Sequence, residues 1–392
     1  MKKLFFFLAL VLATSMAMAQ IDTVNVANTT QDGNQNDVLV KQIGSDLYGS
    51  VQQFGNSNDA YVKQNGKENM GIVDQIRGDR NDGFVSQTGN KNQGYIQQGL
   101  TTDYYDDYTG TANAPSGYNL YANDNNAAVT QSGNENFSSI GQWGHHNTGS
   151  SIQEGNGNDI YIYQGWEGSW WGGPALYSTN SKVDIKQYQN TNSARVWQYG
   201  GDNNTTNVLQ NGTSNLVSVT QGWIYTDLNY DFSAPVLNTK NNFVSIEQIG
   251  NSNKAKMMQL GDNNLFKLSQ SGNNNEVGYF AGNLEPSRNA YFTQDGDNNK
   301  VAGVYKNASD DLAFWESQDA EQFNGATLSY ESYQAGNSNI IGLRQGMDDM
   351  ATIQQDGIGN EALLYQYGAD RNVANMMQFG NNNTSQVVQI QQ

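Results

Sequence analysis

A short unit recurs along almost the whole chain, and its spacing limits the possible folds more than any other feature. The unit reads Gln-x-Gly-x-x-Asn-x-φ-x-φ-x, where φ is usually apolar, and the next Gln then follows. One clear copy runs from Gln53 through Gly55, Asn58 and Val62 to Gln64. We count about 28 units when degenerate copies are included. So many copies in register indicate a repetitive architecture rather than an ordinary globular domain.

The spacing inside the unit is that of a β-strand. The Asn, the two φ positions and the closing Gln lie two residues apart, which is the period of a strand with one buried face. We therefore expect Asn36, Val38 and Gln42 to face inward and Asp37 to face outward. The segment around each Gly is expected to be a turn, because Gly tolerates positive φ. A helix is excluded, since the apolar positions do not recur at three and four residues.

One such strand cannot bury its inner face alone, so two facing strands joined by a turn should enclose a thin core. Stacking these pairs predicts an all-β fold, a β-solenoid of about 14 two-strand rungs with an amyloid-like cross-β arrangement. The inner Asn and Gln amides should then form ladders along the axis, because an unpaired buried amide costs about 1–3 kcal/mol. The spacing alone is also compatible with four strands per turn.

Two sets of residues follow from this register. The self-assembly ladder is predicted to contain inward amides from both ends and the middle of the chain: Asn36, Gln42, Gln53, Asn58, Gln64, Asn69, Gln75, Gln87, Asn215, Gln221, Asn253, Gln259, Asn264, Gln270, Asn360, Gln366, Asn383 and Gln389. The turn glycines are predicted to be Gly33, Gly44, Gly55, Gly66, Gly212, Gly250, Gly261 and Gly357.

The first residues have the pattern of a secretory signal. Lys2 and Lys3 precede the apolar run Leu4 to Leu12, and Ala19 ends a small-residue cleavage motif. The apolar run is shorter than the roughly 20 residues that a membrane span needs. We expect residues 1–19 to be a signal peptide and residues 20–392 to form a single solenoid.

The repeat is interrupted by insertions near residues 99–124, 165–180, 222–241, 282–287 and 331–334. Each follows an odd-numbered strand at steps of four strands, so all five should emerge from one edge of the solenoid. The larger insertions are aromatic. They either pack on one another or form a contact surface for sugars or a neighbouring filament, through Tyr104, Tyr105, Trp166, Trp170, Trp171 and Trp223.

Composition excludes several classes of function. The formal net charge of −18 disfavours nonspecific binding to nucleic acid, which needs clustered Lys and Arg. The chain has no Cys, and its two His residues, His145 and His146, are expected to be solvated turn residues rather than metal ligands. No signature of a catalytic triad, phosphate loop or dinucleotide site is present. We therefore expect no enzyme activity, no metal and no cofactor.

The unit resembles the core of the curlin repeat, found in the subunits of curli fibres on bacterial surfaces. The segments QFGNSNDAYVKQ, from Gln53, and QIGNSNKAKMMQ, from Gln248, match it closely and place Ala60 and Ala255 at the family's Ala position. The resemblance covers nearly the whole chain after the leader. It implies two strands per repeat of about 22 residues. It also implies a secreted amyloid subunit that leaves the cell through a dedicated outer-membrane channel and builds biofilm matrix.

Repeat-like positions extend from Asn25 to Gln389, and neither end of this region has a helix, Pro cluster or Lys-rich strand that would cap it. We therefore expect a structural subunit that self-assembles into extracellular curli-like fibres, with itself, a nucleator and the secretion channel as partners. The alternative is a secreted monomeric adhesin or glycan-binding protein that acts through the aromatic insertions.

Overall fold

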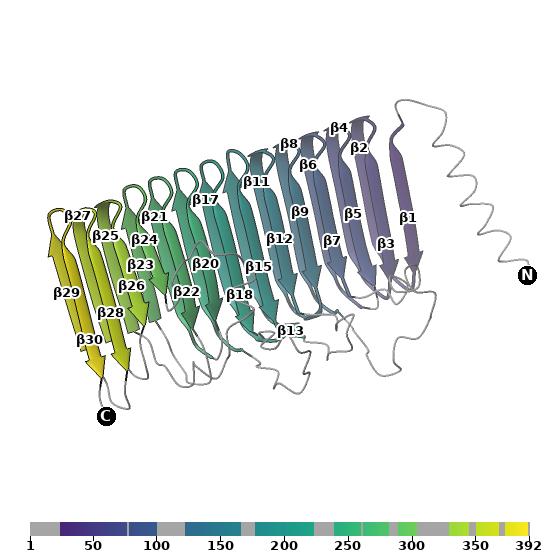
Figure 1. Ribbon diagram of the computed structural model, residues 1–392. Coiled ribbons are helices and arrows are strands. Elements are labelled where there is room, and N and C mark those ends of the chain that lie inside the picture. Colours follow the sequence, from purple (N-terminus) through teal and green to yellow (C-terminus); the bar gives the residue numbers. More distant parts are fainter. Residues whose placement is uncertain are drawn as a thin grey trace, which may run out of the picture.

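A computed structural model describes residues 24–76, 78–99, 122–165, 177–222, 239–259, 262–281, 289–303, 329–344, 350–367 and 373–390. These residues form two long parallel β-sheets that face each other (Figure 1). The described part of the chain contains no helix, and so none that could span a membrane. The expected all-β solenoid is confirmed.

The two sheets alternate along the chain, so that consecutive long strands belong to opposite sheets. Sheet A has 14 strands: β1 (Val26–Asp32), β3 (Tyr48–Phe54), β5 (Met70–Ile76), β7 (Gln93–Gln98), β9 (Phe137–Gln142), β12 (Asp159–Gln164), β15 (Ser193–Tyr199), β18 (Leu216–Gly222), β20 (Lys254–Gln259), β22 (Glu276–Ala281), β24 (Lys300–Gly303), β26 (Ile340–Arg344), β28 (Glu361–Tyr367) and β30 (Thr384–Ile390).

Sheet B has 13 strands: β2 (Asp37–Ser45), β4 (Asp59–Lys67), β6 (Asp82–Asn90), β8 (Asn126–Asn134), β11 (Thr148–Asn156), β14 (Lys182–Tyr188), β17 (Thr205–Asn211), β19 (Phe243–Ile249), β21 (Leu265–Ser271), β23 (Asn289–Asp295), β25 (Ser329–Asn337), β27 (Met350–Ile358) and β29 (Val373–Phe379). The two sheets together contain 14 + 13 = 27 strands, close to the expected 28.

Register is set by the repeat itself. Each strand pairs in parallel with the strand two units away, and equivalent positions fall opposite each other, as Gln53 does with Gln75 and Gln42 with Gln64. One turn of the solenoid therefore contains two strands, and the four-strand alternative is excluded. A one-residue slip would turn every inward side chain to the outside, so the buried face fixes this register strongly.

The core is a thin layer of apolar side chains between the two sheets. Val62, Val73, Val85 and Ile96 are fully or almost fully buried, and they belong to one continuous cluster that runs the length of the molecule. Each buried side chain of this size contributes about 1.5–3 kcal/mol. Because each rung adds the same few residues, the core grows in length but not in thickness.

The two edges of the solenoid differ. At the short-turn edge, strands of sheet B lead to strands of sheet A through regular turns, whereas at the insertion edge strands of sheet A lead to strands of sheet B (Figure 1). Long intervals between consecutive strands follow β7, β12, β18 and β22 at the insertion edge. All these intervals follow strands of sheet A.

The fifth predicted insertion is wrong. Residues 331–334 lie inside β25, where Tyr330 pairs with Ala351 and Gln334 pairs with Gln355. The repeat unit that contains Tyr330 is hard to recognise in the sequence, because an aromatic residue stands at the position that usually holds Ala. The long interval instead separates β24 from β25, two strands after the previous one rather than four.

A third, small sheet lines part of the insertion edge. It consists of β10 (Gly144–His145), β13 (Ser178–Thr179) and β16 (Gly201–Asp202), and isolated bridges extend it to Asn123 and Lys240. Two of its residues, Ser178 and Thr179, fall inside a predicted insertion. The chain therefore rejoins the stack, in register, before that predicted insertion ends.

Candidate self-assembly site

The inward glutamines of sheet B form one continuous column of hydrogen bonds. In each pair, Nε2 of one Gln donates to Oε1 of the next, at distances between 2.7 and 3.1 Å. The column contains Gln42, Gln64, Gln87, Gln131, Gln153, Gln187, Gln210, Gln248, Gln270, Gln294, Gln334, Gln355 and Gln378.

Sheet A has an equivalent column, which among the described residues is continuous from Gln31 to Gln259. Its bonds, 2.8–3.1 Å long, join Gln31, Gln53, Gln75, Gln98, Gln142, Gln164, Gln198, Gln221 and Gln259. The next strand places Ala281 in register with Gln259, and Gln259 Nε2 is buried there without a hydrogen-bond partner. Farther along, Gln366 donates to Gln389 at 2.6 Å.

Each amide also ties the two sheets together. Gln53 Nε2 lies 3.0 Å from the carbonyl oxygen of Asp37, in the preceding strand of sheet B, and 2.9 Å from that of Asn58, which precedes the following strand. Most interior glutamines bond to the strand before them and to the equivalent glutamine of the next rung, and some, such as Gln53 and Gln64, also bond to the turn after them. The sequence predicted the stacking of the glutamines but not these bonds to the backbone.

The asparagine columns use the backbone as well. Asn58 N–H donates to Asn36 Oδ1 at 3.0 Å, and Asn58 Nδ2 donates to the carbonyl oxygen of Gly78 at 2.9 Å. Each Asn thus links its own turn to the turns of both neighbouring rungs. The prediction of amide-to-amide ladders describes the Gln columns better than the Asn columns.

The predicted ladder residues differ in burial according to their position. Those in the interior of the stack, such as Gln64, Asn69 and Gln221, are almost completely buried. The four nearest the ends are half-buried, because a neighbouring strand covers them on only one side: Asn36, Gln42, Asn383 and Gln389.

The turn glycines stack on one another at very short range. Gly33, Gly44, Gly55, Gly66, Gly212, Gly250 and Gly357 all have φ between 111° and 142°, whereas Gly261 lies outside the described residues. A Cβ built on Gly66 would lie 1.9 Å from the carbonyl oxygen of Gly89. Only a residue without a side chain allows the rungs to approach this closely.

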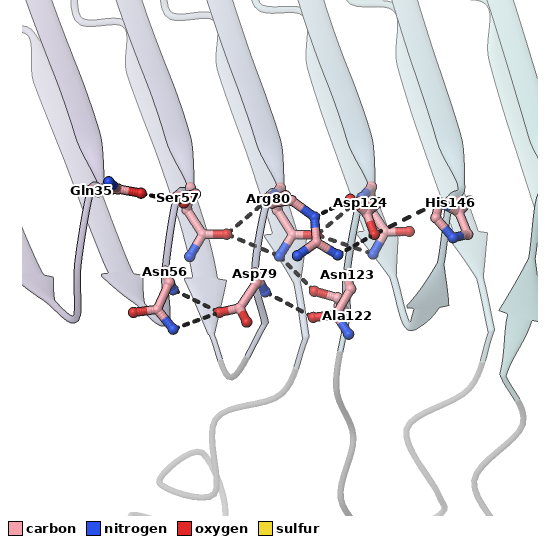
Figure 2. A network of polar contacts seen from close by, with 12 residues as sticks. Gln35, Asn56, Ser57, Asp79, Arg80, Ala122, Asn123, Asp124 and His146 are labelled. Atoms are coloured by element: carbon pink, nitrogen blue, oxygen red, sulfur yellow. Dashed lines mark hydrogen bonds and ion pairs between the residues drawn. The ribbon is translucent and has the colours of Figure 1, made fainter.

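A second turn position has positive φ but is not glycine in most units. The residue before each Asn adopts the left-handed conformation, as in Ser57, Arg80, Asp124 and His146, all with φ of 57–58°. These side chains line up outside the turn, where Arg80 donates to both carboxylate oxygens of Asp124 at 2.6 and 2.7 Å (Figure 2). The sequence did not identify this position, because its residue types vary.

The adjacent turn position contributes further bonds between rungs. In this column, Asn56 N–H donates to Asp79 Oδ1 at 2.7 Å, and Asp79 N–H donates to Asn123 Oδ1 at 2.8 Å (Figure 2). His146 Nδ1 lies 3.8 Å from Asp124 Oδ2. No cluster of three His, Cys, Asp or Glu side chains that could hold a metal ion occurs among the described residues.

The sequence also predicted an aromatic contact surface in the insertions. Tyr104, Tyr105, Trp166, Trp170, Trp171 and Trp223 all lie outside the described residues. Aromatic pairs that were not predicted from the sequence lie on the outer faces of the sheets. Tyr61 stacks on Phe84 with ring centroids 5.2 Å apart, and Phe137 packs against Tyr161 at 5.0 Å.

Both Gln columns have the same polarity. In every Gln–Gln bond of the two columns, Nε2 donates toward the C-terminal end of the stack and Oε1 accepts from the N-terminal side. The N-terminal end of the described stack thus presents amide oxygens and the C-terminal end presents amide N–H groups. The two ends are complementary.

These features define a two-sheet parallel β-solenoid that is held together by inward amide columns. The family model of the curlin associated repeat matches residues 44–76 and 239–272. The chain therefore contains curlin associated repeats, and the resemblance seen in the sequence is confirmed at these two segments. No curated protein matches the chain significantly.

Proposed function

We propose that this chain is a secreted structural subunit that self-assembles end to end into extracellular curli-like amyloid fibres of a biofilm matrix. The observation that supports this best is the pair of open, complementary ends. Gln42 at one end lacks a donor for Oε1 among the described residues, and Gln378 at the other lacks an acceptor on a following glutamine. A second copy supplies both.

Energetics favour such a joint. About ten backbone hydrogen bonds per added rung, each worth about 0.5–1.5 kcal/mol net, would form between the end strands of two copies. Side-chain ladders and apolar burial add to this sum. The backbone bonds alone are comparable to the roughly 4–15 kcal/mol that association costs in lost freedom, so the side-chain terms make growth at a well-formed end favourable.

The other parts of the proposal rest on the curlin repeats. We infer export under the direction of residues 1–19, passage through an outer-membrane curlin channel, and growth from a nucleator at the cell surface. The net charge of −18 would limit sideways clumping of fibres and leave axial growth open.

The direct test is assembly of residues 20–392 after dilution from denaturant. We expect fibres in electron micrographs, seeded growth without a lag, and a diffraction spacing of about 4.8 Å along the fibre axis. Protein that stays monomeric at high concentration and in the presence of seeds would contradict the proposal.

A further inference from the structure

The number of strands in the described stack is odd, and this sets how two copies can join. Sheet A has 14 strands and sheet B has 13. Each unit of one strand and one turn takes the chain from one sheet to the other. This step is equivalent to a half-turn about the solenoid axis combined with a rise of half a rung. The 27 described units therefore end in sheet A, the sheet in which they began.

Two joints are conceivable, and only one leaves no gap. If the next copy keeps the same orientation, its β1 lies on β30 and continues sheet A. Its β2 then lies two strand spacings, about 10 Å, from β29, and one strand of sheet B is missing at the joint. If the next copy is rotated by a half-turn about the axis, its β1 lies on β29 and its β2 lies on β30. Both sheets then continue without a break.

The rotation is compatible with strand direction and with side-chain type. A half-turn about an axis perpendicular to the strands exchanges the two sheets and reverses the direction of each strand, as the solenoid itself does between successive units. Inward positions in both sheets carry the same pattern, with Gln31 in β1 and Gln42 in β2 at equivalent places. Gln378 of β29 would then face Gln31 of the next copy, and Gln389 would face Gln42.

The hydrogen bonds of the end glutamines favour the rotated joint independently. Interior glutamines such as Gln53 bond to the preceding strand, the following turn and the next glutamine. Among the described residues, Gln31 Nε2 bonds only to Gln53, and Gln389 Nε2 only to the carbonyl oxygen of Val373, at 3.2 Å. The group that discriminates between the joints is Gln31 Nε2, which lacks the carbonyl oxygen that the preceding opposite strand supplies to Gln53 and Gln64.

The rotated joint supplies these missing partners. It places β30 as the strand that precedes β1 of the next copy, so that Gln31 Nε2 gains the carbonyl oxygen of Thr384. It also places Asn25 directly after β30, so that the carbonyl oxygen of Asn25 becomes available to Gln389 Nε2. In the unrotated joint, Gln31 Nε2 instead faces the gap left by the missing strand. The carbonyl oxygen of Asn25 lies at the opposite edge of the solenoid from Gln389.

Resting on the proposed self-assembly, we infer that successive copies of this chain are related by a half-turn in the fibre. The insertion edge then alternates from one side of the fibre to the other with each copy. Successive copies are then 13.5 rungs apart along the fibre axis, because each of the 27 units rises by half a rung. At the usual strand spacing this distance is about 65 Å. A fibre of even-numbered units would instead carry every insertion edge on one side.

Cross-linking distinguishes the two joints, because the chain has no Cys of its own. In the rotated joint Asp32 lies beside Phe379 of the preceding copy, and in the unrotated joint it lies beside Ile390. We expect a short thiol cross-linker to join fibres of the double variant Asp32→Cys/Phe379→Cys into covalent ladders on a denaturing gel. Fibres of Asp32→Cys/Ile390→Cys should give few or none. The reverse result would overturn the inference.

Cryo-electron microscopy of the fibre gives the second readout. We expect a rotation per copy of about 180° plus the accumulated sheet twist, with insertion edges on alternate sides. Deletion of 384–392 removes β30, makes the strand number even and should bring all insertion edges to one side. Deletion of 254–275 removes a complete rung, β20 and β21, and is the matched control that should keep the alternation.

The outcomes separate the two levels of the proposal. Wild-type fibres with every insertion edge on one side would overturn the half-turn and leave the self-assembly function intact. Failure of all variants and of the wild-type chain to form fibres would contradict the function, and the half-turn with it. The wild-type map decides the question even if one deletion variant does not fold.

Discussion

Gln259 and Ala281 occupy equivalent positions in neighbouring strands of sheet A, and the buried Nε2 of Gln259 has no acceptor at that point. The same column is continuous over the eight preceding bonds. The interruption begins at Ala281, where the strand pairing continues without a change of register.

Restoring this glutamine should stabilise the fold. We expect Ala281→Gln to raise the free energy of unfolding by about 1 kcal/mol, because the new Oε1 would accept from Gln259. Chemical denaturation measures the change. Met258→Gln, which adds an amide at the outward neighbouring position, is the matched control and should have little effect. Equal gains from both variants would show that the buried amide is not the cause.

Removing an interior glutamine should have the opposite effect. Gln64→Ala leaves Gln42 without its acceptor and Gln87 without its donor, which should lower the free energy of unfolding by about 1–3 kcal/mol and slow assembly. Lys63→Ala changes the adjacent, exposed position on the outer face and should alter neither by more than about 0.5 kcal/mol. Assembly kinetics and denaturation midpoints are the measurements, and a similar loss in both variants would contradict the inward role.

Two glycines of one turn should respond very differently to the same substitution. A Cβ on Gly155 would lie 1.8 Å from the carbonyl oxygen of Gln189, and φ there is 130°. We expect Gly155→Ala to cost more than about 3 kcal/mol, because the rungs must separate. Gly157 has φ of 64°, and its Cβ would meet only a methyl group at 3.6 Å, so Gly157→Ala should cost about 1 kcal/mol. Thermal unfolding compares them.

Acid should stabilise the rungs around Asp74. Burial on the outer face of β5 raises the pKa of this carboxyl group from 3.8 to about 6. Between these values the folded chain binds more protons than the unfolded chain, so this contribution to stability is greatest below pH 4 and is lost as the pH rises through 6. Burial and the neighbouring Asp59 also raise the pKa of Asp82.

The matched variants are Asp74→Asn, which stays neutral at every pH, and Asp37→Asn on the exposed outer face of β2. We expect Asp74→Asn to raise stability at pH 7 and to flatten the dependence of stability on pH between 4 and 7. Asp37→Asn changes an exposed side chain and should alter stability at pH 7 by no more than about 0.5 kcal/mol. Denaturation midpoints at several pH values provide the measurement, and an unchanged slope in Asp74→Asn would rule out this carboxyl group as its source.

The periodic parts of the structure could be predicted from the sequence because register follows from burial. Once Val62 and Gln64 must face inward, the strand, its partner and the stacking of Gln64 on Gln87 are determined. The interruptions carry no such constraint, and Tyr330, which stands in register with Ala351, obscures the repeat at that point of the sequence. Bonds from glutamine to the backbone, such as that from Gln53 to Asp37, depend on the stagger between the two sheets, which no spacing within one unit reveals.

The hydrogen bond from Gln87 to Gln131 crosses 44 residues of sequence, whereas the bond from Gln64 to Gln87 crosses 23. The geometry of the two bonds is the same, although the intervening chain is about twice as long in one of them. Each doubling of a flexible loop adds only about 0.6 kcal/mol of closure entropy. Foreign peptides or small domains grafted between β7 and β8 should therefore be displayed along the filament at little thermodynamic cost, which makes the scaffold a natural carrier for engineered surfaces.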